Sequence, residues 1–176
     1  MHSIEEKDEL LQRLDKARQD LTIAVARLSQ TQSNFKPSPE AWSIANIAEH
    51  IATVEEFTIL RLQQMVSEPD SGHFKDADAT LFNKAADRSA KRQAPERVRP
   101  TGKPLANSLE RLATNYEKLS DLIRSAPEGH FRQHSMPHPA FGPLDGHQWL
   151  VFTAGHCARH TEQIIQTKSA PNFPQG

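Results

Sequence analysis

The sequence predicts an all-α protein in which residues 1–176 form a single four-helix bundle. Four long segments carry apolar residues at steps of three and four, the spacing of a helix with one buried face. The 12 prolines lie mainly between these segments, as expected because proline is excluded from helix interiors. No stretch alternates β-branched and polar residues, so strand signals are weak throughout. Four helices of roughly 20–27 residues pack readily as a bundle.

The first two predicted helices each have one apolar stripe. In the first, Arg18 interrupts a stripe that consists of Leu11, Leu14, Leu21, Val25 and Leu28. The second is predicted to begin after Ser43, a residue suited to the N-cap, and its stripe consists of Ile44, Ile47, Ile51, Val54, Phe57 and Leu62. Beside the first stripe lie Leu10, Ala17 and Ala24. Because they widen the apolar surface of that helix, we expect a two-fold homodimer through helix faces.

The last two predicted helices have clearer boundaries. The third has a strict stripe made of Leu105, Leu109, Leu112, Tyr116, Leu119 and Ile123. The fourth is predicted to begin at a capping box of Asp145 and Gln148 and to run to about Lys168. Leu144 and Trp149 occupy the positions of a hydrophobic staple around that cap.

Two connections in the predicted bundle are long. Residues 67–103 form a polar crossover between the second and third helices, and we expect a short helix near residues 79–90 within it. Residues 127–143 contain several prolines and are interpreted as a stiffened loop. His130, His134 and His138 are assigned to this loop, with His138 near the mouth of a cleft.

Composition excludes several classes of protein. Lys and Arg total 21 against 22 Asp and Glu, giving a net charge of −1, which argues against a broad surface for nucleic acid or anionic membrane. No apolar run approaches the roughly 20 residues of a transmembrane helix, and the first residues do not resemble a signal peptide. The single cysteine, Cys157, cannot form an internal disulfide and is interpreted as a core residue. We therefore expect a cytoplasmic protein.

Three histidines are predicted to point inward from two helices. His156 and His160 lie about 40° apart on the face that carries Trp149 and Phe152, and His50 shares its face with a stripe of the second helix. A buried imidazole needs a partner, and a divalent metal could satisfy all three at once. A single inward histidine is more often a hydrogen-bonded core residue, and the adjacency of the two helices is inferred, so this reading also stays open.

Two better-known kinds of metal site do not match this pattern. A metalloprotease helix needs Glu directly after the first histidine, where Cys157 stands. A carboxylate-bridged di-iron bundle needs Glu three residues before each histidine, but positions 47 and 153 are Ile and Thr. Gln163 lies one turn beyond His160 and is a candidate to orient a substrate, although it could also be a packing or surface residue.

Several motifs together resemble the DinB-like (YfiT) superfamily over nearly the whole chain. They are the residues 138–144 (HPAFGPL), Gln148-Trp149-Leu150, His156-x-x-x-His160-x-x-Gln163-Ile164, Trp42-Ser43-Ile44, His50-Ile51, Ala94-Pro95 and Val98-x-Pro100. The resemblance implies a four-helix bundle, commonly dimeric, with one zinc, nickel or other divalent ion held by His50, His156 and His160. Characterised members of this superfamily include transferases and isomerases that use low-molecular-weight thiols.

The predicted function follows from the histidines and the resemblance together. We expect a mononuclear metalloprotein, an enzyme of the thiol-dependent transferase or isomerase type or of the hydrolase type, acting on a small molecule. The alternative is a binding or interaction module that the metal stabilises without turnover. A metal with open coordination positions beside a cleft would favour the enzyme, and a closed site would favour the module.

Overall fold

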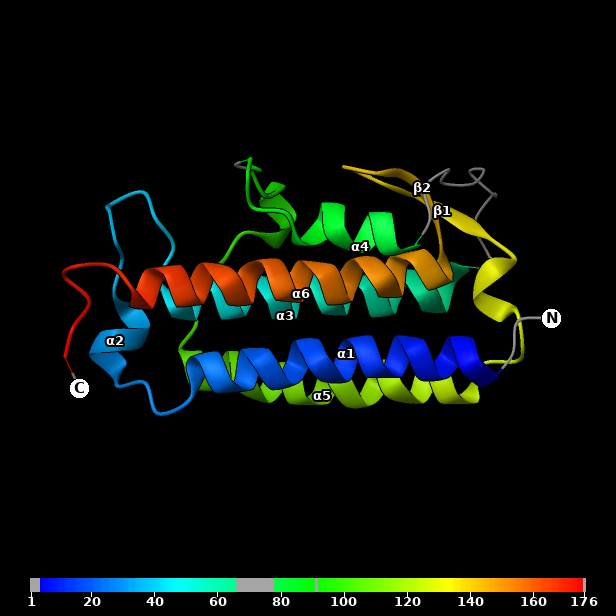
Figure 1. Ribbon diagram of the computed structural model, residues 1–176, viewed down its shortest axis with the longest axis horizontal. Helices are drawn as coiled ribbons and strands as arrows, with labels where there is room; N and C mark the ends of the chain where they lie inside the picture. Colours follow the sequence, from blue (N-terminus) through cyan, green and yellow to red (C-terminus); the bar gives the residue numbers. More distant parts are fainter. Residues whose placement is uncertain (1–3, 66–77, 91, 176) are drawn as a thin grey trace.

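The predicted four-helix bundle is confirmed by a computed structural model that describes residues 4–65, 78–90 and 92–175. Its four long helices are α1 (Ile4–Val25), α3 (Ile44–Gln64), α5 (Leu105–Ser125) and α6 (Gly146–Lys168) (Figure 1). Shorter elements are the helices α2 (Gln30–Asn34) and α4 (Asp78–Ala86), the 3-10 turns η2 (Glu96–Val98) and η3 (His130–Arg132), and the strands β1 (Ser135–His138) and β2 (Gly142–Asp145).

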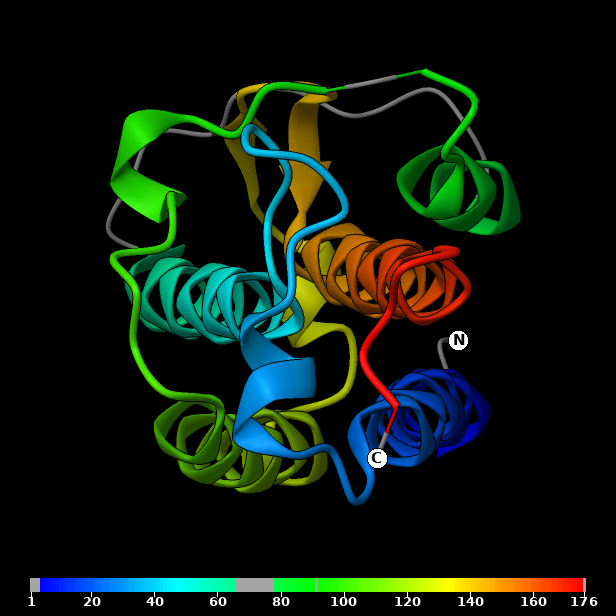
Figure 2. The ribbon, with the colours of Figure 1, turned by 90° about the vertical axis from the view of Figure 1, so that its left-hand side faces the viewer.

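The order of helices around the bundle explains the long crossover. Helix α6 packs against α1 and α3, while α5 packs against the other sides of the same two helices (Figure 2). Helices α3 and α5 are therefore neighbours, and they run in the same direction (Figure 1). The chain must return along the bundle between them, and it does so over the outer side of α6 and α3, with α4 packed on α6. Residues 66–77 of the predicted crossover lie outside the described residues.

Both predicted helix starts are confirmed. The Ser43 side chain accepts from the Asn46 N–H, and the Asn46 side chain accepts in return from the Ser43 N–H. Asp145 and Gln148 form the same reciprocal pair at the start of α6. These caps satisfy backbone donors that the first turn of a helix leaves without partners. The staple residues of the second cap, Leu144 and Trp149, are both fully buried.

The buried face of α1 differs from the predicted stripe. Its core residues are Leu10, Leu14, Ala17, Leu21, Ala24 and Val25. Arg18 lies at the edge of this face and pairs with the buried Glu55 carboxylate at 2.8 Å. Leu28 follows the end of the helix. The small side chains of Ala17 and Ala24 let α1 approach its neighbours closely, so the apolar positions expected to widen the surface are covered within one chain.

The region predicted as a loop contains a small antiparallel hairpin, so the expectation of no strand was wrong here. Ser135 pairs with Asp145 and His138 pairs with Gly142. Gly142 has φ +75°, a left-handed conformation that glycine adopts without strain and that closes the three-residue turn. Met136 and Leu144 face the core, and the neighbouring Pro137 and Pro143 form the next cross-strand pair. Because proline is uncommon in strands, these two residues made the strands hard to predict from the sequence.

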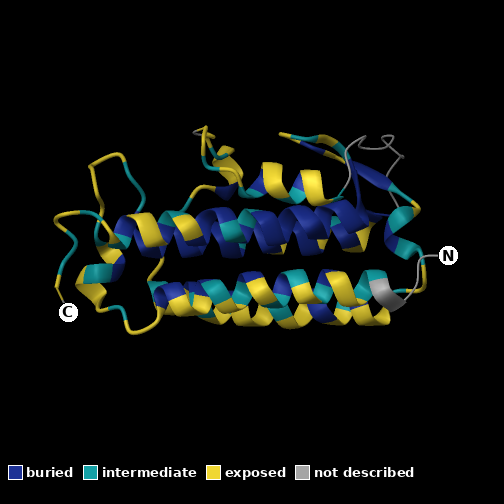
Figure 3. Ribbon diagram, viewed as in Figure 1, coloured by how far each residue is buried: buried dark blue, intermediate teal, exposed yellow. Residues whose placement is uncertain are grey.

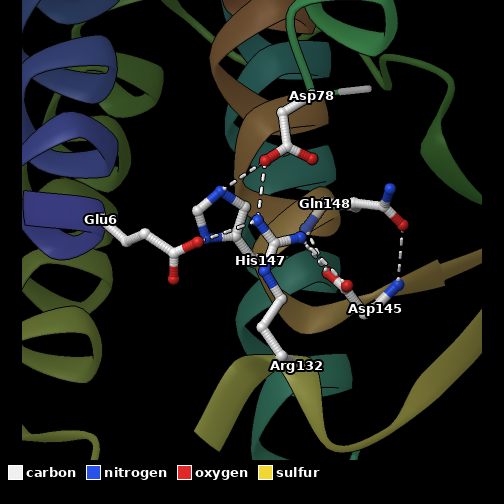
Figure 4. Close-up of polar contacts among 6 residues, drawn as sticks. All are labelled: Glu6, Asp78, Arg132, Asp145, His147 and Gln148. Atoms are coloured by element: carbon white, nitrogen blue, oxygen red, sulfur yellow. Dashed lines mark hydrogen bonds and ion pairs between the residues drawn. The ribbon is translucent and has the colours of Figure 1, made fainter. Parts of the chain in front are cut away.

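A network centred on Arg132 joins five elements at the end of the bundle where α6 begins (Figure 4). The guanidinium group donates to Asp78 of α4 at 2.7 Å, to Asp145 at 3.1 Å and to Glu6 of α1 at 3.4 Å. His147 lies 3.0 Å from the same Asp78 oxygen. Burial alone would raise the pKa of Asp78, but its bonds to His147 and Arg132 outweigh burial and lower it. The network fixes the start of α4 relative to α6.

Within the described residues, no helix combines the length and apolarity that crossing a membrane requires. Burial is instead concentrated on α6, which is covered on several sides (Figure 3).

Helices α4 and α6 approach each other most closely at Gly155. A Cβ at this position would lie 2.8 Å from the Phe82 carbonyl oxygen and 2.9 Å from the Ala85 Cβ. Both atoms belong to the α4 segment, and the first is backbone, which cannot rotate out of the way. The glycine is therefore required for α4 to pack this closely against α6.

We expect Gly155→Ala to lower the free energy of unfolding by about 1–2 kcal/mol because it forces α4 away from α6. The same change in an unconstrained helix would gain about 1 kcal/mol, so the loss opposes the intrinsic preference. Urea unfolding measures it, and adding Ala85→Gly should cost less than the sum of the two single changes. A variant as stable as the wild type would contradict the close approach.

Candidate metal site

Three histidine rings meet between α3 and α6. His50 comes from α3, and His156 and His160 come from α6, where their spacing of four places them one above the other. The ring centroids lie 4.9 Å apart for His50 and His156, 4.7 Å for His50 and His160, and 4.5 Å for the α6 pair. One nitrogen from each ring lies within 4.8 Å of the other two. The predicted adjacency of the two helices is confirmed.

The crossover determines the orientation of His50. Its Nδ1 lies 2.7 Å from the carbonyl oxygen of Val98, in the η2 turn, so Nδ1 carries the proton and Nε2 presents a lone pair. The adjacent Glu49 holds the next residues of the crossover, because its carboxylate accepts hydrogen bonds from the backbone N–H groups of Thr101, Gly102 and Lys103. Burial alone would raise the pKa of Glu49, but these bonds and one from the Thr101 hydroxyl lower it.

Gln163 determines the orientation of His160. The Gln163 side-chain oxygen lies 2.8 Å from His160 Nδ1, so this ring also donates through Nδ1 and presents Nε2 as a lone pair. The same oxygen accepts from Arg88 at 3.3 Å. Gln163, predicted as a candidate to orient a substrate, thus contacts a histidine and acts as a positioning residue for that ring.

The environment keeps all three imidazoles neutral. Burial lowers the pKa of His50, and it lowers the pKa of His160 to about 3, with the neighbouring His50 adding to the effect. For His156 the pKa is held well below its usual value by burial and by the two other histidines. Neutral imidazole is the protonation state that binds a metal.

The donor set fits one divalent ion. His50 Nε2 and His156 Nε2 lie 3.1 Å apart, and two nitrogens bound to one tetrahedral zinc ion lie about 3.4 Å apart. With Nδ1 of His50 and His160 engaged by oxygen acceptors, their remaining nitrogens face the shared centre as lone pairs. Such converging lone pairs repel one another unless a proton or a cation lies between them. Oxygen acceptors behind the ligating rings are a general feature of histidine metal sites.

The cluster is not sealed from solvent. His50 and His160 are buried, but His156 and Gln163 are only half-buried. The half-buried Trp42 lies beside the cluster, with its ring 5.0 Å from His50 and 6.5 Å from His160. Trp42 therefore packs against the core and also lines the candidate site.

Of two further residues near the cluster, Cys157 was predicted correctly, and His138 was wrongly expected in a loop at the mouth of a cleft. Cys157 is buried, and burial raises the pKa of its thiol to about 12, which confirms it as a core residue. His138 is buried by the hairpin against Trp149 and Phe152, at 4.8 and 4.3 Å between ring centroids. Its ring is therefore part of an aromatic layer that continues from Phe152 to His156 at 5.4 Å.

The chain belongs to the DinB superfamily, whose sequence model matches residues 13–164. The uncharacterised protein YuaE of Bacillus subtilis is 30% identical over 143 residues, which are 80% of this chain and 86% of YuaE. The family inferred from the histidine and proline motifs is thereby confirmed.

Two solved structures share the fold. YfiT from Bacillus subtilis, described as a probable metal-dependent hydrolase with an unusual four-helix bundle topology, superposes with a TM-score of 0.67 at 16% identity. The match covers 99% of this chain and 92% of YfiT. The four-helix bundle protein TT2238 gives 0.59 at 22% identity, over 91% of this chain and 98% of TT2238.

His138 provides a pH-dependent contribution to stability. Burial and the charges of Arg92 and Arg97 lower its pKa to about 4, against about 6.5 in the unfolded chain. The unfolded chain therefore takes up a proton first as the pH falls. The stability linked to His138 is present in full above pH 6.5 and is lost between 6.5 and about 4, reaching a loss of about 2 kcal/mol by pH 5.

The variant His138→Asn tests this contribution. Asparagine retains an acceptor for the Ala140 N–H, which His138 Nδ1 binds at 3.1 Å, but it does not titrate. Between about pH 8 and pH 5, the fall in the free energy of unfolding should be about 2 kcal/mol smaller for the variant than for the wild type. Equal falls, measured by urea unfolding of metal-free protein, would contradict the assignment.

Proposed function

We propose that the chain is a mononuclear metal-dependent enzyme in which His50, His156 and His160 hold one divalent ion, zinc or nickel. The observation that carries the proposal is the convergence of three neutral imidazoles, two of them oriented through Nδ1 so that Nε2 faces the same centre. The description of YfiT as a probable metal-dependent hydrolase supports it at the level of a shared fold.

The chain's own residues support catalysis over a purely structural ion. Three protein ligands leave coordination positions free, and the half-buried His156 and Gln163 place that side of the cluster toward solvent. A divalent ion held there supplies Lewis-acid chemistry, which polarises a small-molecule substrate and lowers the pKa of a nucleophile. Trp42 lies beside the cluster on one side, with its ring against those of His50 and His160.

Two reaction types are consistent with this site, hydrolysis and transfer or isomerisation that uses a low-molecular-weight thiol. Cys157 cannot supply the sulfur nucleophile, because it is buried and its pKa is raised to about 12. A thiol reaction would therefore require an external thiol. Assays of the metal-loaded protein with an electrophile, with and without added thiol, and with an activated ester distinguish the two types.

A binding or interaction module stabilised by the metal is the alternative function. It would be supported if the bound ion exchanged no water and the protein turned over neither kind of substrate. In that alternative the same three histidines are the ligands. Metal content therefore does not distinguish the enzyme from the module, whereas water exchange and turnover do.

The ligand assignment predicts about one divalent ion per chain in the purified protein, and loss of that ion in His50→Ala and in His156→Ala. Each change removes one of three ligands and leaves two, which bind a divalent ion weakly. Elemental analysis of the purified proteins measures this. His130→Ala is the control, since His130 contacts Phe131 rather than the cluster, and it should retain the metal. Undiminished metal in both ligand variants would refute the assignment.

Gln163→Ala should weaken metal affinity about 10-fold while leaving the three ligands in place, because His160 loses the acceptor that orients it. Competition with a metallochromic chelator measures the affinity. Gln166→Ala is a matched control: Gln166 also accepts from Arg88, at 3.1 Å, but does not contact His160. Equal affinities in the two variants would show that Gln163 does not orient the ligand.

The homodimer and the cytoplasmic location remain predictions. Large apolar side chains exposed on the described surface are Ile23, Leu60 and Ile165, on three different helices. Sedimentation equilibrium at micromolar concentration should give twice the chain mass of 19.8 kDa. A mass of one chain that does not rise with concentration would exclude the dimer. In that case the packing of α4 on the bundle, with Leu81 buried beneath it, covers enough apolar surface for the chain to exist as a monomer.

A further inference from the structure

Four arginines lie on the crossover and on α6, on the side of the bundle that carries the three-histidine cluster, and we call them the arginine rim. Arg88, Arg92 and Arg97 follow α4 in the crossover, and Arg159 precedes His160 on α6. The crossover passes over the side of the bundle formed by α3 and α6, so residues that are far apart in sequence reach the same face (Figure 2). In the sequence, residues 84–99 contain several basic residues, a pattern that a solvated surface could also explain.

Two members of the rim lie directly beside His160. Arg88 donates at 3.3 Å to the Gln163 oxygen that also accepts from His160. Arg159 is the residue before His160 and donates to the Ala90 carbonyl at 3.0 Å, which ties it to the crossover. Arg159 is therefore the sequence neighbour of a candidate ligand, and Arg88 shares a hydrogen-bond acceptor with that ligand.

The other two members reach the cluster through aromatic rings. The Arg92 guanidinium lies 5.1 Å from the centre of the Phe141 ring, and Phe141 packs on Phe152, which contacts His156. Arg97 lies 4.6 Å from the centre of the Phe57 ring and immediately precedes Val98, the acceptor for His50. Arg97 therefore lies beside the segment that orients His50, whereas Arg92 is connected to His156 only through the rings of Phe141 and Phe152.

The charges of the rim have no ion-pair partners among the described residues. Arg18, Arg111 and Arg132 elsewhere in the bundle each pair with a carboxylate. The acidic groups nearest the rim make no ion pair with it: Asp87 accepts from Ser89, and Glu162 accepts from Gln166. In the rim itself, burial and the charges of Arg88 and Arg92 lower the pKa of Arg159, and the charge of Asp87 opposes this lowering.

Arg159 provides an independent indication of a ligand. Its side chain is only 7% exposed, and its Nη1 makes no hydrogen bond within the described structure. A buried donor on a charged group without a partner costs about 1–3 kcal/mol or more, and like charges nearby add to the cost. A buried donor of this kind needs an explanation, and a ligand that accepts from it is one.

We propose that the arginine rim binds an anionic group, a carboxylate or a phosphate, of the small molecule on which the three-histidine site acts. The guanidinium fork matches the geometry of both groups, and neighbouring charges of one sign attract the opposite sign. The net charge of the chain is −1, so the positive potential is local, which suits a small anion rather than a polyanion. This inference rests on the proposed function, because it names the substrate class of that site.

Isothermal titration calorimetry with inorganic phosphate and with succinate tests the proposal. Metal-free protein is used first, so that coordination to an ion cannot account for binding. The variants Arg159→Gln and Arg92→Gln should each weaken binding about 10-fold, and a rise in salt should weaken it further. Arg92 is exposed, so its substitution is compatible with folding even if Arg159→Gln is not. Tighter binding of phosphate or of succinate identifies which anionic group the rim prefers.

Arg13→Gln is the matched control. Arg13 also stacks on an aromatic ring, that of Phe82, at 5.6 Å, but on the α1 side of the bundle, and its removal should leave anion affinity unchanged. Failure of the wild type to bind either anion, or equal binding by all variants, would overturn the proposal. Metal analysis of the protein as purified, and again after incubation with zinc or nickel, keeps the two proposals apart. Arginine-dependent anion binding by a protein that neither carries nor takes up metal refutes only the proposed function, and metal uptake without arginine-dependent anion binding refutes only this inference.

Discussion

The structure depends on three neutral imidazoles held close together inside a helical bundle. Burying even one such ring without partners is unfavourable, and here two rings use Nδ1 for an oxygen acceptor and direct Nε2 toward the third. The arrangement requires α3 and α6 to be neighbours, since they carry His50 on one side and His156 and His160 on the other. The capping boxes that begin both helices determine where along each helix these side chains lie.

The topology of the bundle contributes to the site as well as to stability. Because α3 and α5 are parallel neighbours, the chain must cross back along the bundle, and the face that it crosses is the one that carries the histidines. The crossover thereby delivers the Val98 carbonyl to His50, and Glu49 anchors the segment that follows. It also brings Arg88 to Gln163. Gly155 and the Arg132 network keep α4, the first part of this segment, on α6.

Local patterns in the sequence predicted the bundle and the histidine cluster. The helical periods, the capping boxes and the i, i+4 spacing depend on residues within one or two turns of each other. The prediction failed where long-range packing decides the outcome: the face of α1 shifted toward Leu10 and Ala17, and two prolines concealed the hairpin that buries His138. The partner of His50 could not be predicted, because the Val98 carbonyl is a backbone atom 48 positions away from it.

X-ray absorption spectroscopy of the purified protein at the edge of its bound metal tests the central claim most directly. The account predicts an ion surrounded by three imidazole nitrogens, at about 2.0–2.1 Å for zinc, with the remaining positions filled by light atoms from outside the chain. A closed shell of four protein ligands would contradict the catalytic assignment. A spectrum without imidazole scattering would contradict the site itself.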